Sequence, residues 1–308
     1  MAKELKSLSA SLIKTWETCS WLYYAKYVLR LPDTSNDGAR RGTLCHKVFE
    51  LLQNPRHRSH FELIHKSHSV SASTAVSRLV LKLAMKAGIN DEENLEMVHD
   101  MIPVGLKHDF LLEGAESKEK PEYRFDVTDD QNRFRIKGFI DLLAFFKDHA
   151  VIRDFKTSKA KFGKAELNPN LQNLIYSWFV YFKFKVMAKT QFLFLRFPKQ
   201  PLQEPTPCTL DDLQGAEEYF AYVSDQIQDF NEEKGKLNFA TRSRATKWLC
   251  GSSEPGKWCC SYRKPFAYYA LLDSEGKVKR TSFVNDLIPG EGETVERKKY
   301  SGCPRYYS

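Results

Sequence analysis

The sequence predicts an α/β fold in which a mixed central sheet is flanked by helices. Three segments, 122–127, 133–141 and 151–157, are rich in the β-branched and aromatic residues that favour strands. An apolar segment, 171–187, is expected to form a helix that packs on the sheet, and 191–197 is expected to form a further strand. The predicted order is therefore three strands, a helix and a strand, within a single domain that spans residues 1–308.

Helices are expected on both sides of this strand-rich segment. Serines at positions 7 and 9 precede an amphipathic stretch and are suited to cap a helix. Apolar residues at three- and four-residue steps predict helices at 73–87 and 92–112, inside a helical insertion lobe that covers residues 54–120. Residues 211–231 predict another helix. Residues 240–308 form a basic region that contains four of the cysteines, and we expect it to pack on the core.

The charge balance points to a polyanionic partner. The 308 residues include 47 Lys and Arg but 39 Asp and Glu, a net charge of +8. A basic surface attracts the phosphate backbone of nucleic acids. No apolar run is long enough to span a bilayer, and the first residues lack the apolar core of a signal peptide. We therefore expect a cytoplasmic protein with no membrane partner, whose seven cysteines are reduced unless they hold metal.

Two carboxylates and a lysine are expected to converge on one face of the sheet. Side chains alternate along a strand, so Asp154 and Lys156 project on the same side. A polar break at 147–149 supplies a turn, which places Asp141 across from this pair. Neighbouring carboxylates repel each other, and a hard divalent cation between them relieves the repulsion. Taken alone, Asp-x-Lys occurs by chance in many proteins and is more often an ordinary surface ion pair on a strand.

Two helical motifs accompany these residues. Gly42, His46 and Glu50 recur every four residues and share one face of a predicted helix. Downstream of the strands, Gln172 and Tyr176 are one helical turn apart. A helical histidine is commonly a packed or solvated residue, so the order in which all the motifs occur carries the argument.

In this order the motifs resemble the PD-(D/E)XK nuclease superfamily. The histidine motif upstream and Gln-x-x-x-Tyr downstream resemble its RecB-like branch, which includes CRISPR-adaptation nucleases and phage recombination exonucleases. The resemblance implies a restriction-endonuclease-like core in which Mg²⁺ or Mn²⁺ is bound. The implied ligands are His46, Asp141, Asp154 and the carbonyl of Phe155. Glu122 resembles an acidic residue often present on the first strand of the family.

The resemblance also implies roles for the other motif residues. Lys156 would orient the attacking water or stabilise charge that develops on the phosphate. Glu50 would help to position a second metal ion or its water. Gln172 and Tyr176, with Thr157 beside them, would contact DNA or brace the active site.

The cysteines resemble a further feature of this branch, a [4Fe–4S] cluster held by one cysteine before the histidine motif and three near the C-terminus. The sequence departs from that pattern, because serine instead of proline follows Cys19 and the C-terminal cysteines are not closely grouped. A zinc site or packed free thiols are the alternatives. The possible cluster ligands are Cys19, Cys250, Cys259, Cys260 and Cys303.

We expect a divalent-metal-dependent DNA nuclease, an exonuclease on single-stranded DNA or DNA ends, acting in recombination, repair or replication. Basic and aromatic residues alternate between positions 242 and 264, which suits single-stranded nucleic acid. The chain has no Walker motif, so a helicase or recombination partner would have to unwind DNA. A non-catalytic DNA-binding or assembly protein on the same fold is the alternative, and an RNA substrate is also open. The sequence does not indicate an oligomeric state.

Overall fold

The structure, a computed structural model, describes residues 5–33, 36–237, 250–251 and 259–306. The chain forms two compact units. The central unit consists of residues 35–221, and the terminal unit combines residues 1–34 with 222–308. All the predicted nuclease motifs fall within the central unit.

A five-stranded mixed sheet organises the central unit, as the sequence predicts. Its order is β2 (Ser117–Lys118), β5 (Leu142–Phe145), β6 (Ala150–Lys156), β7 (Ala188–Phe194) and β8 (Leu202–Gln203). β6 and β7 are parallel, whereas the other neighbours are antiparallel. A parallel pair needs a long crossover connection, and α8 (Leu171–Phe184) provides it. This arrangement confirms the predicted fold class.

A separate hairpin of β3 (Tyr123–Thr128) and β4 (Arg135–Ile140) precedes this sheet. The Asp129 carboxylate closes its turn by accepting hydrogen bonds from the backbone N–H groups of Arg133 and Phe134. The strand predicted at 133–141 spans only Arg135–Ile140, and the strand that pairs with β6 is β5, which the sequence does not predict. The chain changes partners at Asp141: β4 pairs with β3, and β5 pairs with β6.

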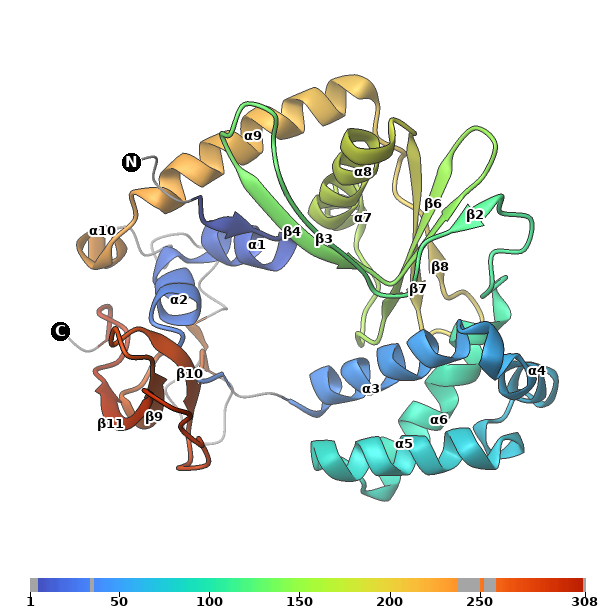
Figure 1. The fold of residues 1–308 in the computed structure, drawn as a ribbon, viewed down its shortest axis with the longest axis horizontal. Coiled ribbons are helices and arrows are strands. Elements are labelled where there is room, and N and C mark those ends of the chain that lie inside the picture. The colour runs from blue at the N-terminus through green and yellow to red at the C-terminus, as the bar shows by residue number, and fades with distance from the viewer. Residues whose placement is uncertain (1–4, 34–35, 238–249, 252–258, 307–308) are drawn as a thin grey trace. The chain divides into compact units, whose positions relative to one another are not determined.

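Helices cover one end of the sheet in the central unit. α3 (Asp37–Leu52) lies between the sheet and the pair α5 (Thr74–Ala87) and α6 (Glu92–Lys107), as Figure 1 shows. α4 (Arg58–Ser67) and two 3₁₀ turns, Pro55–His57 and Val70–Ala72, connect α3 to this pair. α6 ends at Lys107, five residues before the predicted limit. A continuous hydrophobic core connects these helices to the sheet, where it includes Phe155 of β6, Leu193 of β7 and Leu195, which directly follows β7.

Two further helices follow in the chain, and the second of them extends beyond the central unit at Tyr222. The short α7 (Lys164–Leu167) follows β6, and α9 (Leu210–Gln228) follows β8. Phe220 of α9 packs against Phe134 and Trp178, with ring centroids 5.6 and 6.1 Å away. The helix predicted at 211–231 thus forms with nearly the expected bounds.

The terminal unit begins with β1 (Ser7–Leu8), α1 (Ala10–Thr18) and α2 (Ser20–Tyr23), followed by a π-helical turn, Tyr24–Val28. The Ser9 side chain caps α1 by accepting from the N–H of Leu12. The chain returns to this unit at Tyr222, within α9, and continues with α10 (Glu232–Leu237) and an antiparallel sheet. That sheet has the order β10 (Val278–Ser282), β9 (Phe266–Leu272) and β11 (Thr294–Tyr300). None of the helices that the structure describes has the length and apolar content of a membrane span.

Candidate active site

Asp141 lies where two strand registers meet. In the β3–β4 hairpin Tyr123 pairs with Ile140, so the next pair along would be Glu122 with Asp141. In the β5–β6 hairpin Leu142 pairs with Arg153, so the preceding pair would be Asp141 with Asp154. The backbone N–H of Glu122 donates to the Asp141 carbonyl over 3.2 Å. The change of partner at Asp141 therefore brings three carboxylates together.

α3 supplies the histidine because two of its residues fit closely against β6. The Phe49 ring packs on Phe155 with centroids 4.4 Å apart. At Gly42 the helix comes so near the end of β6 that an added Cβ would lie 2.9 Å from Thr157 Oγ1. His46, between these two contacts on the same side of α3, consequently faces the junction at Asp141.

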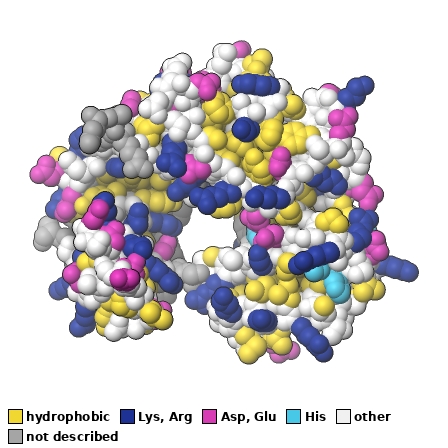
Figure 2. Space-filling view, viewed as in Figure 1, with side chains coloured by type: hydrophobic (Ala, Val, Ile, Leu, Met, Phe, Trp, Pro, Cys, Tyr) yellow, Lys and Arg dark blue, Asp and Glu magenta, His cyan; other side chains and the backbone are white. Residues whose placement is uncertain are grey.

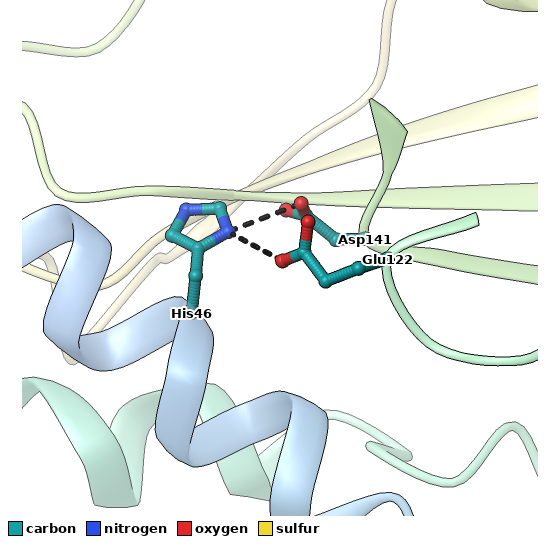
Figure 3. A group of neighbouring side chains, drawn as sticks. All are labelled: His46, Glu122 and Asp141. Atoms are coloured by element: carbon teal, nitrogen blue, oxygen red, sulfur yellow. Dashed lines mark hydrogen bonds and ion pairs between the residues drawn. The ribbon is translucent and has the colours of Figure 1, made fainter. Parts of the chain in front are cut away.

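The imidazole of His46 joins two carboxylates (Figure 3). Its Nδ1 lies 3.1 Å from Asp141 Oδ1 and 3.4 Å from Glu122 Oε1. Its Nε2 lies 3.1 Å from the carbonyl oxygen of Phe155. Asp141 Oδ2 accepts a 2.7 Å hydrogen bond from the Phe155 N–H, which fixes the carboxylate against β6. Within the described parts of the chain, His46, Glu122 and Asp141 are the one group of potential metal ligands in such close proximity.

The electrostatics of this cluster favour a cation. Burial favours the neutral imidazole, but hydrogen bonds to Asp141 and Glu122 outweigh it and raise the pKa of His46 to about 10. Both ring nitrogens face oxygens that only accept, so the ring is an imidazolium that donates from each. Burial and the charge of Asp154 raise the pKa of Asp141 to about 6. The oxygens around this ring are therefore suited to positive charge, whether a proton on His46 or a bound metal ion carries it.

Gln172 contacts both members of an ion pair between the buried Asp154 and the partly buried Lys156. Lys156 Nζ lies 2.6 Å from Asp154 Oδ2 and donates to Gln172 Oε1 over 2.6 Å. The Gln172 amide nitrogen donates to Asp154 Oδ1 and to the Tyr176 hydroxyl. The Tyr176 hydroxyl in turn donates to the carbonyl of Phe139 on β4. Gln172 and Tyr176 thus hold the ion pair and tie α8 to the strand that leads into Asp141.

The donor set fits a hard divalent ion. Ligand atoms at adjacent corners of an octahedron with 2.1 Å bonds are about 3.0 Å apart. The 3.1 and 3.4 Å separations from His46 Nδ1 to Asp141 and Glu122 are close to this spacing. Asp154 adds a buried oxygen, Oδ2, for which the described residues offer no well-oriented hydrogen bond besides its ion pair with Lys156. The combination of one nitrogen and several oxygens accommodates both Mg²⁺ and Mn²⁺.

The structure brings Glu122, rather than Glu50, into the cluster around His46. Glu50 is half-exposed and pairs with Lys47 over 2.6 Å, one turn beyond His46. Glu122, which the sequence marked only by its resemblance, completes the cluster with His46 and Asp141. It has a positive φ of 54°, a conformation that the turn before β3 imposes. The predicted strands at 122–127 and 133–141 contain a signal for this contact, because their observed register places Glu122 opposite Asp141.

The family model of the PD-(D/E)XK nuclease superfamily matches residues 7–262. The chain belongs to this superfamily. In this sequence, residues 154–156 read Asp-Phe-Lys, which has the form (D/E)XK, and Ile140 instead of proline precedes Asp141.

The solved structures that are distantly similar to this chain include two proteins from different organisms. A candidate exonuclease from Eubacterium rectale is 10% identical, with a TM-score of 0.46 over 81% of this chain and 90% of the other. Protein VC1899 from Vibrio cholerae is 11% identical, with a TM-score of 0.24 over 64% of this chain and 56% of the other. No curated protein is similar enough in sequence to count as a relative.

Four cysteines of the terminal unit line one pocket. These cysteines are Cys19, Cys250, Cys260 and Cys303, so one comes from the N-terminal segment and three from the C-terminal segment of this unit. Aromatic side chains also line the pocket. Burial raises the pKa of the Cys260 and Cys303 thiols to about 11. Arg263 closes one side by donating to the carbonyls of Cys250 and Gly251, and its guanidinium lies 4.0 Å from the Tyr306 ring centroid. Cys259 is not among the lining residues.

The spacing of these thiols bears on what they could bind. Thiolates on a tetrahedral zinc ion with 2.3 Å bonds are about 3.8 Å apart. Among the described residues, no three of these sulfurs lie within 4.8 Å of one another. These sulfurs, as the structure places them, therefore do not form a zinc tetrahedron. The basic and aromatic positions predicted at 242–248 and 257–258 lie outside the described residues.

Proposed function

We propose that the protein is a divalent-metal-dependent DNA nuclease of the RecB-like branch, acting on single-stranded DNA or DNA ends. One observation carries the proposal: the His46–Glu122–Asp141 cluster adjoins the Asp154–Lys156 ion pair, in a member of a nuclease superfamily. Carboxylates, a histidine and a lysine at one site are the groups that metal-assisted phosphodiester hydrolysis requires.

The proposed metal ligands are His46, Glu122, Asp141 and Asp154. The carbonyl of Phe155, which the resemblance implies as a further ligand, lies against His46 Nε2, whereas the carboxylates lie against Nδ1, so the ring would have to turn for one ion to meet both. When bound, Mg²⁺ or Mn²⁺ lowers the pKa of a coordinated water and polarises the scissile phosphate. His46 must give up its proton to become a ligand, because the imidazolium has no free lone pair on either nitrogen.

Lys156 is the proposed electrostatic catalyst. Gln172 and Asp154 hold its ammonium in place, so it needs no reorganisation to meet negative charge that develops on the phosphate oxygens. Its position also allows it to orient the attacking water. We assign Gln172 and Tyr176 as positioning residues, since their described contacts run to Asp154, Lys156 and the β4 backbone. Glu50 and Thr157, which line the same surface depression as His46 and Glu122, are proposed to act on bound DNA or its water.

The terminal unit is proposed to carry a [4Fe–4S] cluster on Cys19, Cys250, Cys260 and Cys303. Four thiols from separate segments of the chain that line one pocket support this ligand set. Cys259, the fifth sequence candidate, is left out of it. We further propose a cytoplasmic location, where DNA and reduced thiols are both available, a role in recombination, repair or replication, and a helicase or recombination protein as partner.

Cleavage of end-labelled DNA tests the nuclease proposal. Single- and double-stranded substrates are incubated with Mg²⁺, Mn²⁺ or EDTA, and the label's position gives the polarity of cutting. Wild type should cut only with metal, and Asp154→Ala and Lys156→Ala should cut at least about 1000-fold more slowly. Asp148→Ala and Lys147→Ala, on the exposed turn of the same hairpin, are matched controls that should retain full activity.

The alternatives predict different results. If wild type binds DNA but cuts nothing with either metal, the non-catalytic assembly protein becomes the better description. If Asp154→Ala and Lys156→Ala cut as fast as the turn controls, the active site is wrongly assigned. If RNA is cut in preference to DNA, the substrate assignment is wrong.

A further inference from the structure

A broad groove opens beside the metal-binding cluster in the central unit. His46 and Glu122 lie in its wall, so the cluster faces this groove directly. Its open volume is about 1140 Å³, more than a small-molecule site usually offers. Three cations also line it, Arg40 and Lys47 from α3 and Lys86 from α5. In Figure 2, Lys and Arg side chains surround acidic and histidine side chains on this face.

Phe139 is the aromatic side chain in the wall of this groove. It is 54% exposed, although it lies two residues from the buried Asp141. A single exposed apolar residue is common on protein surfaces and needs no explanation by itself. The position of this ring, in the same groove as His46 and Glu122, is what sets it apart.

The strand geometry keeps this ring in the groove. Side chains alternate along β4, and Ile136 and Ile140 fill the buried face. Gly138 shares that buried face, where the Phe125 ring occupies the space of a side chain. The Phe139 carbonyl is held by the Tyr176 hydroxyl. The backbone therefore has no freedom to turn the ring inward.

Basic residues border the ring as well as the groove. Phe139 pairs across the hairpin with Arg124, whose side chain is exposed on the same face. A flat apolar ring bordered by cations matches an unpaired nucleotide, whose base can stack on the ring while its phosphates meet the charges. A base within a duplex is already stacked on both sides and offers no such surface.

We propose that Phe139 is a base-stacking residue that seats an unpaired nucleotide next to the scissile phosphate, so that the groove selects single-stranded nucleic acid over duplex. This proposal rests on the proposed nuclease function, because the metal-binding cluster defines where the scissile phosphate lies. It adds a specificity residue that the nuclease motifs do not contain.

Equilibrium binding tests it without requiring cleavage. Full-length protein is titrated into fluorescein-labelled oligo(dT) or a blunt duplex in Ca²⁺, and anisotropy gives the dissociation constants. Phe139→Ala should weaken single-strand binding about tenfold, within the range for loss of one stacked base, and leave duplex binding unchanged. Phe139→Trp should restore single-strand binding, whereas Phe139→Leu, which is apolar but has no π-face, should not. Tyr222→Ala removes another exposed aromatic ring, 63% exposed on α9, and should bind like wild type.

Three results would overturn the proposal: Phe139→Ala binding single strands like wild type, Phe139→Leu binding as well as Phe139→Trp, or equal losses for single strands and duplex. Melting temperatures of the variants identify any loss that arises from unfolding. The two proposals fail separately. Cleavage by wild type with unaltered binding by Phe139→Ala rejects only the stacking role, and the expected binding pattern without any cleavage rejects only the nuclease function.

Discussion

At the scale of single residues, the site consists of groups that each contact two others. Gln172 uses both ends of its amide, accepting from Lys156 and donating to Asp154 and Tyr176. His46 likewise uses both ring nitrogens, one toward carboxylates and one toward the Phe155 carbonyl. Such paired contacts fix the rotamers of these side chains, and they should make metal binding at the proposed site sensitive to pH.

Metal affinity should rise with pH. The pKa of His46 is raised to about 10 by its acidic neighbours, so below that pH each ion that binds must displace a proton. The logarithm of the Mn²⁺ association constant should increase by about one per pH unit between pH 7 and 9. Below pH 6 the slope should steepen, because Asp141, with its pKa raised to about 6, is then protonated as well. Calorimetry in buffers of different ionisation enthalpy measures both affinity and proton release.

His46→Asn is the control for this pH dependence. It removes the titrating ring, so its weaker Mn²⁺ binding should change much less with pH over the same range. Wild-type affinity that stays constant from pH 7 to 9 would show that no proton is displaced from His46.

At the scale of helices and strands, two glycines permit the approach that builds the site. Gly42 allows α3 to reach Thr157, and Gly138 leaves room for the Phe125 ring beneath β4. A Cβ at Gly138 would lie 2.5 Å from Phe125 Cζ, far inside van der Waals contact. Because Phe125 is buried, its ring cannot move aside without disturbing its stack on Phe179, 4.1 Å away between centroids.

Gly138→Ala should therefore destabilise the protein. Overpacking of this kind costs about 1–3 kcal/mol in free energy of unfolding. Urea titration followed by circular dichroism measures it. Gly215→Ala is the matched control: it lies in α9 with nothing within 4 Å of the added methyl, and should be neutral or stabilise by up to about 1 kcal/mol. Equal stability of Gly138→Ala and wild type would mean that the hairpin adjusts more easily than its packing suggests.

At the scale of the whole molecule, the chemistry is divided between the two units. Every proposed metal ligand of the nuclease site lies within residues 35–221, and the four-cysteine pocket lies in the terminal unit. That pocket joins Cys19 to cysteines more than 230 positions later in the sequence. A group bound there would crosslink the two segments of the terminal unit, and its binding free energy would add to folding.

The cysteine set gives a prediction with an internal control. Cys19→Ser and Cys260→Ser should each lose bound iron and acid-labile sulfide, and should melt at a lower temperature than wild type. Cys259→Ser, adjacent to Cys260 but outside the pocket lining, should keep both. Iron and sulfide assays with absorbance near 400 nm on anaerobically purified protein are the measurements. Zinc in place of iron would support the zinc alternative, and wild-type protein without metal would leave packed thiols as the description.

The sequence predicts the position of a site residue well where that position depends only on the alternation of side chains along one strand or on a nearby turn. Alternation along a strand put Asp154 and Lys156 on one face, and the turn at 147–149 set the β5–β6 hairpin. Prediction was less successful at Asp141, which lies at a break between two hairpins, because strand propensity does not reveal a change of partner. The contact between Glu122 and His46 does not follow from local sequence either, because it requires Glu122 to lie opposite Asp141 at the end of the β3–β4 hairpin.

The sequence by itself therefore determined the superfamily, the order of its elements and most of the residues that carry charge into the site. The spacing of apolar and charged residues along single helices and strands is enough to predict these features. Only the tertiary structure decided which groups touch: Glu122 with His46, Gln172 between Lys156 and Asp154, and four of the five candidate cysteines in one pocket. Such contacts join segments far apart in the chain, and they are set by packing distances at positions such as Gly42 and Gly138, which no local pattern encodes.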